Sequence, residues 1–134
     1  MNWVRDIKQN LQEAEKQKRE FDTKCRKEYT RLTPMVMTLL KAIGSEWYGK
    51  IFFVKKYKID TFALPGVFFW GIKRRGRGLD SLPKRLHIKL RIHEDIPYFA
   101  IDALTTDGPT ISVNTSDTSE ENLNKAIAEL IARI

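Results

Sequence analysis

The stretch from Arg85 to His93 constrains the fold more than any other, because apolar and cationic residues alternate along it without a break. Successive side chains of a β-strand point to opposite faces, so this pattern predicts a strand with one buried and one cationic face. A parallel sheet is covered on both faces and would not alternate in this way. We therefore expect an antiparallel sheet with one side open to solvent.

Four further segments have the composition of strands. Segments 49–59 and 67–73 are rich in aromatic and β-branched residues, and shorter segments follow at about 97–103 and 110–114. Both long segments carry aromatic residues at odd and even positions, so we expect both faces of their hairpin to be covered. Together with 85–93, these segments predict a five-stranded antiparallel meander.

The pairing of the third and fourth strands can be predicted residue by residue. A two-residue loop at 94–95 would place His87 opposite Asp102 on the open face. It would also place Arg91 opposite Tyr98, and both pairs are chemically favourable. A four-residue loop is the alternative, and it would keep the same faces but shift every partner by two positions.

The N-terminal region predicts a long helix over 3–32, whose apolar seam recurs at alternating steps of three and four residues, as in a coiled coil. Lys18 and Glu28 interrupt the seam. Such a helix extends about 45 Å at 1.5 Å per residue, whereas five strands span roughly 24 Å. We expect the helix to overhang the sheet and to form a homodimer; folding back on its own domain is the alternative. The predicted oligomer interface consists of Val4, Ile7, Leu11, Phe21 and Cys25.

The pair Thr33-Pro34 predicts a boundary, because threonine caps helices well and proline is tolerated at the first helical position. A short second helix would cover 34–43 and end at Gly44. Alternatively, the proline only kinks one continuous helix. The predicted organisation is a helical arm over 1–44 and an antiparallel domain over 45–134.

The C-terminal helix is predicted by a capping box, with Thr118 as the cap and Glu121 three residues later. Its apolar residues recur at helical spacing from Leu123 to Ile134, so we expect it to pack across the buried face of the sheet. The predicted fold class is α+β, with a long N-terminal helical arm, a five-stranded antiparallel sheet and a C-terminal helix on that sheet.

Composition narrows the cellular setting. The chain has 134 residues, 42% of them hydrophobic, and a single cysteine, Cys25, so no internal disulfide can form. A reducing, cytoplasmic location fits this cysteine content. The N-terminus lacks the apolar core of a signal peptide, and no apolar run reaches the ~18 residues that a membrane helix needs. We expect no membrane partner.

Positive charge is concentrated in one part of the chain. The net charge is +7, but residues 67–92 alone hold eight basic and one acidic residue, whereas residues 93–134 hold two basic and eight acidic ones. Alternate residues of a strand lie about 6.6 Å apart, which is similar to the spacing of phosphates along a single strand. We therefore predict a DNA or RNA contact over 73–93, non-enzymatic and without a cofactor. Its residues would be Arg74, Arg75, Arg77, Arg85, Lys89, Arg91 and Tyr98.

Three alternatives remain open at this point. The cationic face could be only solvated, with the helical arm serving as an assembly module, or it could meet an acidic protein partner. An enzyme would need a nucleophile beside His87 and Asp102, and no motif supplies one. A shared metal ion is excluded for His87 and His93, which lie roughly 20 Å apart along an extended strand. No nucleotide-binding or zinc motif occurs.

Overall fold

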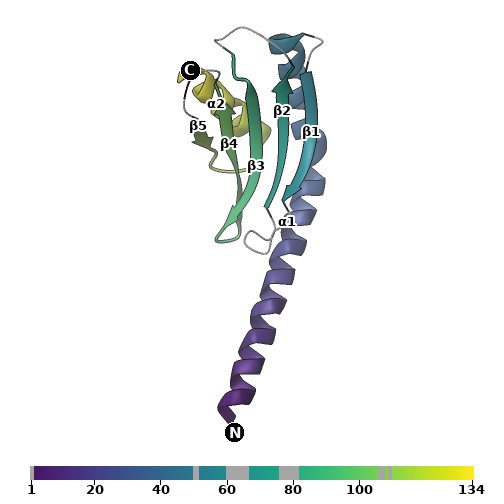
Figure 1. Cartoon of the computed structure of the whole chain (residues 1–134), viewed down its shortest axis with the longest axis vertical. Coiled ribbons are helices and arrows are strands. Elements are labelled where there is room, and N and C mark those ends of the chain that lie inside the picture. The colour runs from purple at the N-terminus through teal and green to yellow at the C-terminus, as the bar shows by residue number, and fades with distance from the viewer. Residues whose placement is uncertain (1, 50–51, 60–66, 76–81, 106–107, 109) are drawn as a thin grey trace.

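The computed structural model describes residues 2–49, 52–59, 67–75, 82–105, 108 and 110–134. Within these residues the strands form one antiparallel sheet in the order β1-β2-β3-β4-β5 (Figure 1). The predicted α+β class, with a long N-terminal helix, an antiparallel sheet and a C-terminal helix, is confirmed. The elements are α1 (Asn2–Tyr48), β1 (Phe52–Ile59), β2 (Val67–Arg74), β3 (Arg85–His93), β4 (Ile96–Leu104), β5 (Ile111–Asn114) and α2 (Glu120–Ala132).

The hairpin of β3 and β4 has the predicted register. His87 pairs with Asp102 and Arg91 pairs with Tyr98 across the two strands. The connecting residues have positive backbone φ angles, 49° at residue 94 and 64° at residue 95. Turns of this kind match the right-handed twist of the flanking strands, which is why a two-residue loop closes this hairpin.

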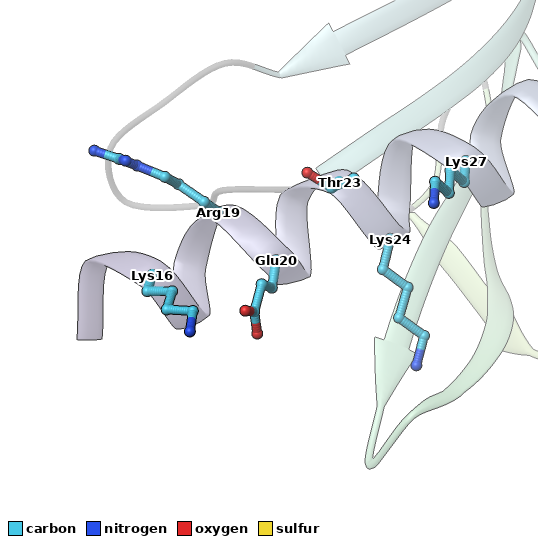
Figure 2. A pocket seen from close by; sticks show the side chains of 6 residues that line it. All are labelled: Lys16, Arg19, Glu20, Thr23, Lys24 and Lys27. Carbon is cyan, nitrogen blue, oxygen red and sulfur yellow. The ribbon is translucent and has the colours of Figure 1, made fainter. Parts of the chain in front are cut away.

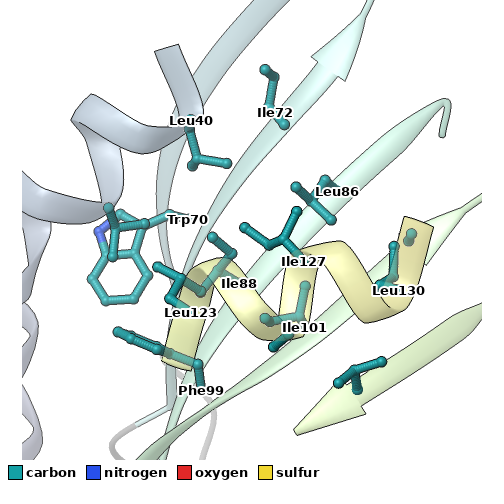
Figure 3. Packing of buried hydrophobic residues seen from close by; sticks show 14 of the residues in the cluster. Leu40, Trp70, Ile72, Leu86, Ile88, Phe99, Ile101, Leu123, Ile127 and Leu130 are labelled. Atoms are coloured by element: carbon teal, nitrogen blue, oxygen red, sulfur yellow. The ribbon is translucent and has the colours of Figure 1, made fainter. Parts of the chain in front are cut away.

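Both helices cover the same face of the sheet. α1 lies against β1, β2 and β3, and α2 lies against β4 and β5, so the helices stand side by side behind the strands in Figure 1. The core fills the space between the two layers (Figure 3). Its largest fully buried side chains include Trp70, Phe99, Leu40, Ile72, Leu86, Ile88, Ile101, Leu123 and Leu130.

An aromatic stack fixes α1 to β2. The ring of Tyr29 stacks on Phe68 at a centroid distance of 4.8 Å and on Trp70 at 4.9 Å. The indole Nε1 of Trp70 donates a hydrogen bond of 3.1 Å to Thr33 Oγ1. Thr33 Oγ1 in turn donates to the carbonyl of Tyr29 at 2.6 Å. Thr33 therefore links the middle of the helix to the buried indole rather than capping a helix.

The predicted boundary at Thr33-Pro34 is wrong, because α1 continues through Pro34. A proline inside a helix costs about 3 kcal/mol. Leu32, Val36 and Leu40 follow one another at steps of four residues and are all buried against the sheet. Each such side chain contributes roughly 1.5–3 kcal/mol on burial, so together they outweigh the proline.

Gly44 is also not the end of the helix. A Cβ atom at Gly44 would lie 2.5 Å from the ring of Phe52 and 2.6 Å from Ile72, so glycine is required for the close approach of α1 to the sheet. The helix ends at Tyr48, and Gly49 adopts the left-handed φ of 65° that terminates helices. The predicted boundary between residues 44 and 45 thus falls inside α1.

The cap of α2 lies one residue later than predicted. Ser119, not Thr118, is the N-cap residue, and its side chain accepts a hydrogen bond of 3.2 Å from the backbone N–H of Asn122. Asp117 accepts a hydrogen bond of 2.8 Å from the backbone N–H of Ser119. This bond holds the pKa of Asp117 below its usual value. The Asp117 carboxylate thus orders the turn before α2.

Residues 2–24 of α1, here named the arm, project beyond the sheet (Figure 1). Cys25 is the first buried residue of the helix, so the arm ends where the domain begins. Lys24 Nζ forms an ion pair of 2.7 Å with Asp95 in the β3–β4 turn. Because the arm extends past the sheet, the expected overhang is confirmed.

Among the described residues, no helix combines the length and the apolar character that spanning a membrane requires.

Candidate nucleic-acid interface

The face of the sheet turned away from both helices, here named the open face, carries most of the predicted nucleic-acid residues. Alternation along the strands places every second side chain on this face. Arg85, Lys89 and Arg91 from β3 and Tyr98 from β4 lie on it, as predicted. Further members of the open face are Phe69, Lys73, His87, Asp102 and Ser112.

Four cations are distributed over two neighbouring strands of the open face. Lys73 of β2 is directly opposite Arg85 of β3, and both are exposed. Lys89 and Arg91 follow along β3 and are half-buried. Arg91 is opposite Tyr98, which sets a phenol ring beside a guanidinium group on the same surface. The arrangement offers several positive charges within reach of one extended anionic ligand.

One of these cations already has an acidic partner. Lys89 Nζ lies 2.9 Å from Asp102 Oδ2, and Ser112 Oγ donates a hydrogen bond of 2.7 Å to Asp102 Oδ1. Burial alone would raise the pKa of Asp102, but the hydrogen bonds from Ser112 and Lys89 hold it below its usual value. Asp102 is therefore ionised at neutral pH and offsets part of the charge of Lys89. The more exposed Lys73 and Arg85 keep the stronger external field.

Two rings lie at the middle of the open face. Phe69 and His87 have their centroids 5.0 Å apart and their planes tilted by 47°. Burial, reinforced by the nearby charges of Arg85 and Lys89, lowers the pKa of His87 to about 4. His87 is therefore uncharged at neutral pH and presents a flat ring rather than a cation.

Sequence reasoning missed Phe69 as a site residue. Its hairpin was expected to be covered on both faces, whereas both helices pack on the side of Trp70. The signal that could have found it is its position two residues before Gly71, which lies directly opposite His87. A glycine within a strand marks a place where another group can approach closely, and Phe69 is the next residue before it on the same face.

The loop residues predicted to contact nucleic acid are separated by the structure. The alternation of β2 continues through Arg74, so this side chain lies on the covered face and is only 7% exposed. It lies close to Tyr48, whose pKa burial raises to about 12 despite the opposing charge of Arg74. Arg75 is exposed. Arg77 lies outside the described residues.

A second cationic region lies where the arm joins the domain. A surface pocket lies along α1 there, and Figure 2 shows that the side chains lining it project from successive turns of the helix, with Glu20 as the single acidic residue among them. This region was not predicted, although basic residues at steps of three to five along one helix could have indicated it. The residues lining it are Lys16, Arg19, Glu20, Thr23, Lys24 and Lys27.

The predicted oligomer interface is divided by the end of the arm. Val4, Ile7, Leu11 and Phe21 are exposed, with 39–62% of their surface accessible. Cys25 is only 2% exposed and cannot meet a second copy, because its own domain covers it. Burial raises the pKa of the Cys25 thiol. The seam is thus one continuous apolar pattern whose side chains are exposed along the arm and buried by the domain from Cys25 onwards.

Within the described residues, no group of three or more His, Cys, Asp or Glu side chains is placed to hold a metal ion. No protein-family model matches this chain, and comparisons with curated proteins and with solved structures found no match.

Proposed function

We propose that this protein binds single-stranded nucleic acid across the open face of its sheet. The observation that carries the proposal is the ring pair of Phe69 and His87, which is surrounded by cations from two strands on a face that neither helix covers. Proteins that bind single strands combine cationic tracks for the phosphates with ring surfaces on which bases stack.

Each part of the open face has a role in this proposal. Lys73 and Arg85 are exposed side by side and would meet phosphates at one end of the face. Arg91 and Tyr98 lie opposite each other towards the other end and would hold a phosphate and a base. Between them the His87 ring provides a stacking surface. Exposed Arg75 extends the row of cations beyond β2. A contact of Arg77 with nucleic acid is proposed from the sequence alone.

The test is the fluorescence anisotropy of labelled single- and double-stranded oligonucleotides titrated with the full-length protein over a salt series. The log of the binding constant should fall linearly with log salt, with a slope of about 0.7 per neutralised phosphate for a single strand. In the double variant Arg85→Glu/Arg91→Glu the slope should fall by roughly the contribution of two phosphates.

A matched control carries the same change in charge on the helices. Lys41 and Lys125 are exposed on α1 and α2, on the opposite side of the sheet. The variant Lys41→Glu/Lys125→Glu should keep the wild-type slope. Equal losses in the two double variants would mean that net charge, not the open face, drives binding. Absence of wild-type binding at low salt would contradict the proposal and direct attention to an acidic protein partner.

A second candidate function is assembly through the arm, with the protein as a cytoplasmic homodimer joined by a coiled coil. It is favoured by the exposed apolar side chains of Val4, Ile7 and Leu11 on successive turns. Single polar substitutions there, such as Leu11→Asp, should abolish assembly without weakening the binding of a short oligonucleotide. Loss of oligonucleotide binding in Leu11→Asp would show that the arm takes part in the nucleic-acid site.

A further inference from the structure

The arm carries an apolar stripe that its own domain does not cover. Trp3, Val4, Ile7 and Leu11 are 48–62% exposed, and Phe21 is 39% exposed at the other end of the stripe. At 1.5 Å per residue, the arm extends about 35 Å. Large apolar side chains gathered on one helix face are a mark of an interaction site. The charges beside the stripe indicate which partner fits it.

We propose that the partner is a second copy of this chain, with the two arms paired antiparallel; this inference rests on the assembly through the arm proposed above. In heptad terms, Val4, Leu11 and Lys18 occupy one kind of seam position, and Ile7, Ala14 and Phe21 occupy the other. An antiparallel pair brings the two kinds together. Val4 then contacts the partner's Phe21, Ile7 contacts the partner's Lys18, and Leu11 contacts the partner's Ala14.

The polar interruption at Lys18 decides between the two possible directions. A parallel pair in register would bring Lys18 against the partner's Lys18, two like charges in an apolar seam. In the antiparallel pair Lys18 lies beside the partner's Ile7 instead, where its methylene stem covers the apolar side chain and its ammonium group reaches solvent. The large Leu11 then packs on the small Ala14, which keeps the helix spacing even.

Charges that flank the seam favour the same direction. Lys8 and Glu15 occupy equivalent flanking positions one heptad apart, and both are exposed. Antiparallel pairing places Lys8 next to the partner's Glu15, and symmetry repeats this pair once. A parallel pair would set Glu15 against the partner's Asn10, and the partner's Asp22 against Gln17, and neither pair unites opposite charges.

The length of the arm fits this register. In this register the tip of each arm, at Trp3, comes level with Asp22 of the partner subunit, two residues before Lys24. Lys24 forms the ion pair with Asp95 at the edge of the domain, and the next residue, Cys25, is buried. The overlap therefore uses the whole exposed arm and stops where the domain begins.

The direction can be tested with the full-length protein by disulfide trapping. One chain carries Val4→Cys and a second chain, of different mass through a tag, carries Phe21→Cys. Oxidation of the mixture should yield the mixed disulfide, because the antiparallel register brings these positions together. Val4→Cys alone should not cross-link to itself, since two copies of position 4 would lie about 25 Å apart. The wild-type chain, whose single cysteine is buried, is the control.

The charge pair provides a second, reversible test by sedimentation equilibrium over a concentration series. The wild type should be a concentration-dependent dimer. Lys8→Glu alone and Glu15→Lys alone should each weaken the dimer roughly tenfold, because each change affects two symmetric pairs. The double variant Lys8→Glu/Glu15→Lys should restore it. Lys16→Glu, at an exposed position outside the seam, should leave the dimer unchanged.

Several outcomes would overturn the proposal. A wild-type chain that stays monomeric at every concentration would leave the stripe to a different protein. Self-cross-linking of Val4→Cys would show a parallel pair. Failure of the double charge variant to recover would remove the charge argument for direction. The side chains of the arm make no part of the core, so these variants leave the domain folded, and near-ultraviolet circular dichroism of the buried Trp70 checks this.

Discussion

The two halves of α1 show that one sequence pattern can have two structural outcomes. From Val4 to Leu32 the apolar seam keeps nearly the same spacing, yet Leu11 is 62% exposed and Leu32 is 3% exposed. The difference is the partner, since the sheet covers only the half after residue 24. Helical periodicity therefore predicts which side of a helix is apolar, but not what will cover that side.

The largest expected effect comes from truncating one leucine in each half of α1. Leu40→Ala should destabilise the domain by about 2–5 kcal/mol, because Leu40 is fully buried and truncation leaves a cavity. Leu11→Ala should change unfolding of the dilute monomer by less than about 0.5 kcal/mol. Urea denaturation measures both. Similar losses for the two leucines would mean that the arm is covered in the monomer.

The join between the two halves can be tested at Pro34. This proline is exposed inside α1, so Pro34→Ala restores a backbone donor and should stabilise the protein by up to about 3 kcal/mol. Thermal unfolding measures the gain, and Lys41→Ala, at another exposed position of α1, should have little effect. A loss of stability in Pro34→Ala would show that the proline shapes the helix to fit the sheet.

Gly44 tests how closely the covered half of α1 approaches the sheet. In an open helix, replacing glycine by alanine gains about 1 kcal/mol. At Gly44 the added Cβ would lie 2.5 Å from the Phe52 ring, so Gly44→Ala should instead destabilise by about 1–3 kcal/mol. Denaturant titration measures this change, with Ser45→Ala at the neighbouring exposed position as the control. A gain at Gly44 would show that α1 can move away from β1.

The smallest effect concerns His87 on the open face of the sheet and depends on pH. His87 has a pKa of about 4 in the folded chain and an ordinary value of 6.5 when unfolded. The unfolded chain therefore binds the proton more readily, so this contribution to stability is complete above pH 6.5 and is lost as the pH falls towards 4. The urea midpoint should decline over that range in the wild type and less in His87→Asn. Equal declines would assign the effect to other groups.

The sheet was the most predictable part because alternation is a local property of the sequence. The alternation over 85–93 and the two-residue loop at 94–95 specify the strand, its open face and its partners without reference to any tertiary contact. The continuity of α1 could not be predicted in this way. The local signals at Thr33 and Pro34 favour a boundary, and only the sheet that buries Leu32, Val36 and Leu40 overrides them.

The candidate site was predictable to the same extent. Arg85, Lys89 and Arg91 share the open face because all three have odd numbers in one strand, and this alternation is visible in the sequence. Arg74 was grouped with them by charge alone, although it lies four residues after Trp70 in the same strand and therefore on the same, buried face. The pairing of Lys89 with Asp102 depends on a diagonal contact, which side-chain conformation decides and strand register does not.

The unbroken course of α1 also has a mechanical consequence. Because no loop separates the arm from the buried half, the helix acts as a rigid lever anchored at the rings of Tyr29, Phe68 and Trp70. A force applied at Trp3 cannot be absorbed by a flexible joint and is transmitted as torque to that stack. Any load on the tip of the arm is thus borne by the strands whose reverse side forms the open face.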